Sequence, residues 1–194
     1  DAGTAASYFA TGDTKSLTLN GTVGTLALSN LQVDAFILGI NHNASREGSN
    51  RIHWAIGKIS GTQVALCDKG YNNYYTDGTK YFNMNHWGNV NYGGWKGCDL
   101  RYDILGSTNK APSGYGSQAQ TNRVGYDPTN YDIVNSPVAN TLAAAFPKDV
   151  RKVLKTVTKY TDNTGNANQN NSSAVTSSVD YFFLLSEHEV YGTK

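Results

Sequence analysis

Short runs in which apolar and polar residues alternate are the feature that most restricts the fold. An Asn-Gly pair, Asn20-Gly21, sits inside the first run (SLTLNGTVGTLAL) and is typical of a β-hairpin turn. The second run, residues 33–41, is apolar and too short for a helix, so it indicates a buried strand. Together these runs predict a meander of antiparallel strands. They cover residues 16–28, 33–41, 52–58 and 62–67.

Two segments further along the chain have helical features. Residues 94–106 (GWKGCDLRYDILG) predict a short helix, with Gly106 at the left-handed position that ends it. Ser136-Pro137 predicts the start of another helix, and Pro147 interrupts it before a second set of helical turns. The spacing of the apolar residues predicts that their side chains form one stripe along the helical surface. It comprises Val138, Leu142, Ala145, Phe146, Val150, Val153, Leu154 and Val157.

The last apolar run lies near the end of the sequence. Residues 181–185 (YFFLL) predict a strand that is buried on both faces or nearly so. With the strands and helices above, this gives an α+β fold of antiparallel strands and two or three packed helices. The length of 194 residues is typical of a single domain, so residues 1–194 are assigned to one.

Long irregular segments separate these elements. Residues 69–94 and 107–135 have no period and are rich in Asn, Tyr and Gly, and residues 161–173 are a polar loop. The segment 107–135 exceeds the usual length of a connection, and such loops are usually functional or mobile. The chain has 13 Tyr and 20 Gly. Tyrosine suits binding surfaces and equally suits half-buried strands, so composition leaves both interpretations open.

Charge and hydropathy exclude some partners. The formal net charge is +1 and only 16% of residues are charged, which argues against a nucleic-acid partner. No stretch approaches the ~18 consecutive apolar residues of a membrane-spanning helix, so membrane insertion is not expected. The N-terminal residues lack the basic start and apolar stretch of a signal peptide.

Residues 40–54 (INHNASREGSNRIHW) could bind a metal or carry catalysis. His42 and His53 would approach each other if the flanking strands pair. Zinc normally takes three or four ligands, and no further ligand cluster follows at a suitable spacing. The alternative is a polar turn built by Asn side chains that bond backbone amides, with the two histidines orienting the backbone. The turn is the preferred interpretation, and no metal site and no catalytic residue are assigned.

The other motifs of the sequence do not match a known catalytic or metal-binding pattern. The oxygen-bearing residues after Asp162 fail the EF-hand pattern at its sixth and twelfth positions, so a plain loop is expected. Glu187 and Glu189 could serve hydrolysis, but such pairs more often cap loops. Cys67 and Cys98 could form one disulfide or remain two buried thiols. No cofactor is predicted.

Three segments together resemble a domain-of-unknown-function family of gut Firmicutes, their prophages and phages. They are FILGINHN (36–43), GGWKGCDLR (93–101), and residues 143–165 continuing into DYFFLLSEHEVYG (180–192). Members of that family are similar to the formylglycine-generating-enzyme version of the C-type lectin fold and to variable proteins diversified by retroelements. Their C-terminal Trp-Trp-Leu-Arg-Ser segment is absent here, so the chain is expected to be the N-terminal scaffold part of a longer protein.

The resemblance implies no active site. The cysteine pair that holds copper in formylglycine-generating enzymes lies in the absent part, and Cys67 and Cys98 do not match it. Trp95 is expected to fill the core. Arg101 is expected to bond carbonyls or a carboxylate, with Glu187 or Glu189 as a candidate partner.

The sequence thus predicts a non-enzymatic ligand-binding or adhesion protein of a phage virion, such as a tail or receptor-binding protein, or of a bacterial surface. Its partner would be a host-surface glycan or protein, and a homo-oligomer or virion neighbours are expected. The alternatives are a purely structural virion component and a metal-dependent hydrolase that uses His42 and His53. Aromatic residues of the long loops are the predicted contacts. They are Tyr74, Tyr75, Tyr81, Trp87, Tyr92, Tyr115, Tyr126 and Tyr131.

Overall fold

The computed structural model describes residues 4–59, 62–63, 93–114, 123–162 and 175–185. They form a four-stranded antiparallel sheet in the order β1-β2-β3-β4 and a two-stranded antiparallel sheet of β5 and β6. The strands are β1 (Thr14–Val23), β2 (Leu26–Ile40), β3 (Ile52–Ile59), β4 (Thr62–Gln63), β5 (Val157–Asp162) and β6 (Val175–Asp180). The helices are η1 (Ala5–Ser7), α1 (Ala44–Glu47), α2 (Asp99–Asp103), α3 (Leu142–Ala145) and α4 (Lys148–Arg151).

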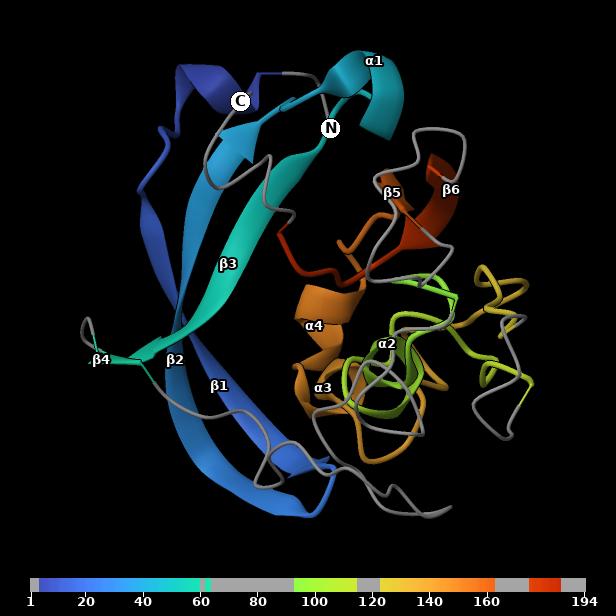
Figure 1. Ribbon diagram of the computed structural model, residues 1–194. Coiled ribbons are helices and arrows are strands. Elements are labelled where there is room, and N and C mark those ends of the chain that lie inside the picture. Colours follow the sequence, from blue (N-terminus) through green and yellow to red (C-terminus); the bar gives the residue numbers. More distant parts are fainter. Residues whose placement is uncertain (1–3, 60–61, 64–92, 115–122, 163–174, 186–194) are drawn as a thin grey trace.

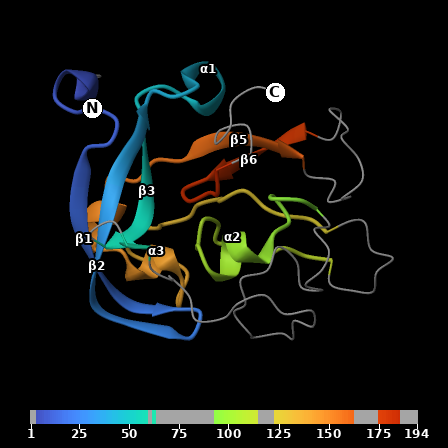
Figure 2. The same ribbon diagram turned by 60° about the vertical axis from the view of Figure 1, so that its left-hand side comes forward.

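The mixed α and β composition and the antiparallel meander predicted from the sequence are confirmed. The larger sheet is curved, and α3 and α4 lie between it and the layer formed by α2, β5 and β6 (Figure 1). The turned view shows the same order of layers, with α3 next to the sheet and α2 beyond it (Figure 2). Register shifts at two places between β2 and β3 mark bulges, which bend a sheet.

The first hairpin is confirmed, but its turn was placed wrongly. The chain reverses at Gly24-Thr25, where Val23 pairs with Leu26 and Gly24 has a φ of 61°. Asn20-Gly21 instead forms a bulge, because the Asn20 Oδ1 atom accepts a hydrogen bond of 2.8 Å from the Asn30 amide. The later turn lengthens β1 and keeps its apolar side chains on the buried face.

The core lies between the larger sheet and the two helices α2 and α3. Buried side chains of β1 and β2 meet Trp95, Cys98 and Leu100 from the α2 region, so the predicted core role of Trp95 is confirmed. The first amides of α3 donate to carbonyls directly after α2: Leu142 N bonds Ile104 O at 2.7 Å, which holds the two helices together. The short helix in residues 94–106 is confirmed, and Gly106 has a φ of 65°.

The helix predicted from Ser136-Pro137 is wrong. Residues before Leu142 form turns, because Asn140 has a left-handed φ of 58° and the Thr141 hydroxyl donates to Val138 O at 2.7 Å. The interruption at Pro147 is confirmed, since α3 ends before it and α4 follows. Val157, assigned to the helical stripe, is instead the first residue of β5.

The strand predicted at residues 181–185 is also wrong. The chain leaves β6 after Asp180, and the amides of Tyr181 and Phe182 both donate to the Ser107 hydroxyl instead of to a neighbouring strand. Leu184 and Leu185 are 45% and 44% exposed, so the run is not buried on both faces.

Arg101 connects α2 to the second sheet through ion pairs and hydrogen bonds. Its side chain is 1% exposed, and its Nε donates at 2.5 Å to Asp180, which is fully buried at the end of β6. The other guanidinium nitrogens reach Asp127 and backbone carbonyls, including Tyr126 O at 2.7 Å. Both kinds of acceptor expected for Arg101 are therefore present. The two acidic partners come from residues that the sequence analysis did not select, and Glu187 and Glu189 lie outside the described residues.

Trp95, Ser107 and Ser178 also donate hydrogen bonds to Asp180, the Ser178 hydroxyl to Oδ2 at 2.6 Å. The Trp95 Nε1 atom donates to Asp180 Oδ2 at 3.1 Å, and the Ser107 hydroxyl donates to Oδ1 at 3.0 Å. A buried carboxylate is tolerated only when it is paired and hydrogen-bonded, and this one meets both conditions.

Candidate functional site: an apolar cavity on the curved sheet

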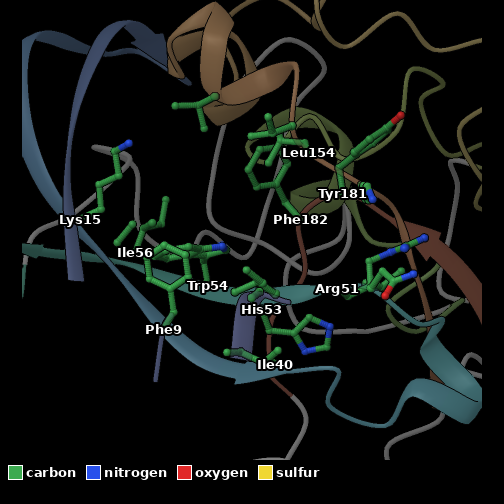
Figure 3. A pocket seen from close by; sticks show the side chains of 18 of the residues that line it. Phe9, Lys15, Ile40, Arg51, His53, Trp54, Ile56, Leu154, Tyr181 and Phe182 are labelled. Atoms are coloured by element: carbon green, nitrogen blue, oxygen red, sulfur yellow. The ribbon is translucent and has the colours of Figure 1, made fainter. Parts of the chain in front are cut away.

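A cavity of about 600 Å³ opens between the curved sheet and the α4 region. Its walls come from η1, from β1 to β3, from residues 146–157 around α4, and from the segment after β6 (Figure 3). The volume falls within the range of known ligand pockets. The lining residues are Thr4, Ala5, Tyr8, Phe9, Lys15, Leu17, Ala35, Ile40, Asn41, Asn50, Arg51, Ile52, His53, Trp54, Ile56, Phe146, Val150, Val153, Leu154, Lys155, Val157, Tyr181, Phe182 and Phe183.

Several large apolar side chains of this lining are open to solvent. Tyr8 is 78% exposed, Phe9 51%, Trp54 43% and Val153 73%. Single exposed apolar residues are common on protein surfaces, but a cluster of them around a hollow marks a binding site or an interface. The alternation of β3 explains the position of Trp54, because His53 on its other face is buried while Trp54 is not.

A cluster of buried charges lies at one end of the cavity. The Lys159 Nζ atom of β5 contacts Glu47 Oε1 of α1 at 2.6 Å, and the His53 Nε2 atom of β3 lies 3.4 Å from Glu47 Oε2. All three residues are at most 6% exposed. The pair of Lys159 and Glu47 therefore ties α1 to the second sheet, and the His53 ring lies beside this pair where it lines the cavity.

His42 and His53 do approach each other, as the pairing of their flanking strands predicts. Their ring centroids are 5.8 Å apart, and the ring of Phe183 packs on His53 at 5.6 Å. Within the described ranges, no group of three or more His, Cys, Asp or Glu side chains could hold a metal ion. The His53 side chain contacts the Glu47 carboxylate and the rings of His42 and Phe183. The role of both histidines in orienting the backbone stays a prediction.

The polar turn predicted for this stretch is confirmed in outline and contains one helical turn, α1. Asn41, Asn43 and Asn50 all have positive φ values, between 51° and 57°, which asparagine tolerates better than most residues. The Asn41 Oδ1 atom accepts a hydrogen bond of 3.2 Å from the Arg51 amide, so one of the expected side-chain to backbone bonds is present.

Two of the predicted ligand-binding residues lie in the described ranges, and neither lines the cavity. The Tyr126 hydroxyl is 2.8 Å from the Ser113 hydroxyl, and the Lys110 Nζ atom lies 3.6 Å above the Tyr126 ring. The Tyr131 hydroxyl donates to Gly106 O at 3.0 Å and accepts from the Val138 amide at 3.1 Å. Burial raises the pKa of Tyr131, with a smaller opposing effect from the Val138 amide. Both hydroxyls therefore hold loops together, and a ligand role for them stays a prediction.

The other predicted contacts lie outside the described residues. They are Tyr74, Tyr75, Tyr81, Trp87, Tyr92 and Tyr115. Cys67 also lies outside, so its pairing with Cys98 stays open. Cys98 is buried in the core, and this burial raises the pKa of its thiol to about 12. A thiolate at this position is therefore strongly disfavoured near neutral pH.

Sequence reasoning missed the cavity. Its residues come from six separate stretches, and in each stretch they follow ordinary strand or helix patterns. The local signal was small: Phe9 and Tyr8 sit in a polar N-terminal stretch, and Trp54 takes a solvent-facing position of a strand. An aromatic residue in a position that alternation assigns to solvent is the kind of signal that could have indicated the site.

Comparison with known proteins returns no match, either to a family model, to a curated protein or to a solved structure. None of the described helices is long and apolar enough to cross a membrane.

Proposed function

We propose that this chain is a non-enzymatic ligand-binding protein that presents the cavity at the surface of a phage particle or a bacterial cell. The observation that carries the proposal is the cavity itself, with Tyr8, Phe9 and Trp54 exposed around it. Aromatic side chains held by a rigid sheet supply a large contact area at a low cost in conformational entropy. The partner is a host-surface molecule.

The resemblance to proteins with the C-type lectin fold supports the same proposal. That fold combines a stable scaffold with variable binding surfaces, and the described fold has a curved antiparallel sheet packed on short helices and a second small sheet. We therefore infer a C-type-lectin-like scaffold for this chain. This inference goes beyond the observed mixture of helices and antiparallel strands. It rests on the three sequence segments that resemble the family.

Truncating the cavity aromatics is expected to weaken binding to the host surface. Trp54→Ala and Phe9→Ala should each lower the affinity of the fluorescently labelled protein for cells about thirtyfold or more, because central aromatic contacts contribute roughly 2 kcal/mol or more each. Flow cytometry across a panel of gut Firmicutes measures this affinity. Tyr160→Ala is the matched control, since Tyr160 is 48% exposed on β5 and does not line the cavity.

Equal binding by all three variants would contradict the proposal and move the contact surface elsewhere, with the Tyr-rich loops as the first place to test. Native mass spectrometry separates a further case. If the wild-type chain forms an oligomer that Trp54→Ala dissociates, the cavity is an interface between copies, and the purely structural alternative is the better account.

A further inference from the structure

The charged side chains of the cavity all have the same sign. Lys15, Arg51 and Lys155 line it, and among the described residues that form its walls there is no Asp and no Glu. The whole chain is nearly neutral, with 16 basic and 15 acidic residues. The local excess of positive charge is therefore a property of this site.

Two of the basic groups stand at opposite ends of an apolar wall. Figure 3 shows Lys15 at one end and Arg51 at the other, with Ile56, Trp54 and His53 between them. No hydrogen bond or ion pair holds the Lys15 ammonium within the described part of the chain. A ligand lying along this wall would have an apolar body and a polar head at one end.

Arg51 is the better placed of the two to bind an anionic head. Its Nε atom donates to Thr156 O at 2.8 Å and its Nη1 atom to Ser49 O at 2.7 Å, so the guanidinium is held in position by backbone carbonyls. The third nitrogen, Nη2, donates to no described residue. A fixed guanidinium with a remaining N–H loses little entropy when it bonds a carboxylate, and such charge-assisted bonds are the stronger kind.

We infer that the ligand of this cavity is a single-chain amphiphile with a carboxylate head, bound as one molecule with its apolar body against Trp54 and its head at Arg51. This inference rests on the proposed ligand-binding function and names the chemical class of the ligand. The apolar wall excludes a bare inorganic anion as the natural occupant, because such an ion would leave the aromatic side chains exposed. The absence of acidic lining residues disfavours a cationic amphiphile.

Three probes that share one alkyl chain test the class of the head. Dodecanoate, dodecyltrimethylammonium and dodecyl maltoside, each below its micelle concentration, are titrated into the full chain by isothermal calorimetry. Dodecanoate is expected to bind at least tenfold more tightly than either of the others. Arg51→Met should remove most of that preference while leaving the affinity for dodecyl maltoside within about twofold.

Lys15→Met is the second variant, because Lys15 is exposed and its replacement is expected to leave the fold unchanged. It should have a smaller effect than Arg51→Met, and circular dichroism checks that both variants are folded. Equal affinity for all three probes would overturn the carboxylate assignment and leave the proposed function intact. No binding by any probe would overturn the amphiphile inference, while the proposed function would still stand or fall by the cell-binding measurement. Binding only to vesicles of anionic phospholipid would show that the ligand is a membrane surface and would also overturn the inference.

Discussion

Replacing Asp180 by alanine is expected to destabilise the fold by about 3–5 kcal/mol, the usual cost of leaving a buried charge without its partner. Arg101 is 1% exposed and would keep its charge, and Trp95 and Ser107 would lose an acceptor. Urea unfolding followed by circular dichroism measures the loss as a lower transition midpoint.

Asp127→Ala is the matched control for this variant. Asp127 pairs with the same guanidinium at 3.3 Å, but its side chain is 34% exposed, so water replaces part of what is lost. Its removal should cost clearly less than removal of Asp180. The double variant Arg101→Met/Asp180→Ala should lose less than the sum of the two single variants, because it leaves no buried charge unpaired. Equal losses for Asp127→Ala and Asp180→Ala would contradict the assigned role of Asp180.

Replacing Lys159 by methionine is expected to have a similarly large effect, again about 3–5 kcal/mol. The substitution removes the ammonium that lies 2.6 Å from Glu47 and leaves that carboxylate in a site that is 5% exposed. It also removes the cation from above the Phe183 ring, where Nζ lies 4.5 Å from the centroid. Thermal and urea unfolding measure the loss.

The exposed ion pair between Lys152 and Asp149 is the control for the buried one. It has the same charges at 2.9 Å, but its side chains are 57% and 90% exposed. Lys152→Met should leave the unfolding midpoint unchanged within error. A double variant, Glu47→Gln/Lys159→Met, should recover part of the loss caused by Lys159→Met. If Lys152→Met and Lys159→Met had equal effects, the buried cluster would not hold the sheets together as described.

The sequence was sufficient to predict the strands of the larger sheet. Their signal is local, because apolar residues such as Leu17, Leu19 and Val33 alternate with polar ones on adjacent strands. The order of the meander followed from the short connections. The left-handed conformation of Gly106 could be predicted for the same reason, although α2 already ends at Asp103 with Ile104 as its cap residue.

The wrong predictions of secondary structure arose where contacts made elsewhere in the fold override the local pattern of the sequence. Residues 181–185 have the apolar pattern of a buried strand. In the structure, however, the buried Arg101 bonds Asp180 at the end of β6. The next two amides, of Tyr181 and Phe182, donate to the Ser107 hydroxyl instead of to a strand. Ser136-Pro137 is a good helix start, but the left-handed Asn140 ends the turns before a helix forms. Neither contact is visible in the sequence near the segment that it alters.

The candidate site was the least predictable part. Predictions based on composition selected the Tyr-rich loops, since tyrosine abundance is visible in the sequence. The cavity depends on how residues far apart in the chain, such as Phe9, Trp54 and Phe182, come together across the curved sheet. The larger sheet, the α4 region and the segments before β1 and after β6 together enclose that space.

Photo-crosslinking shows whether the ligand binds in this cavity. A dodecanoate analogue with a diazirine in its alkyl chain is irradiated with the full chain, and the labelled residues are identified by mass spectrometry. We expect labels concentrated on Phe9, Trp54 and Phe182, and their loss when unlabelled dodecanoate competes. Labels concentrated on the Tyr-rich loops, at Tyr74, Tyr75 or Tyr115, would contradict the account and return those residues to first place as the binding surface.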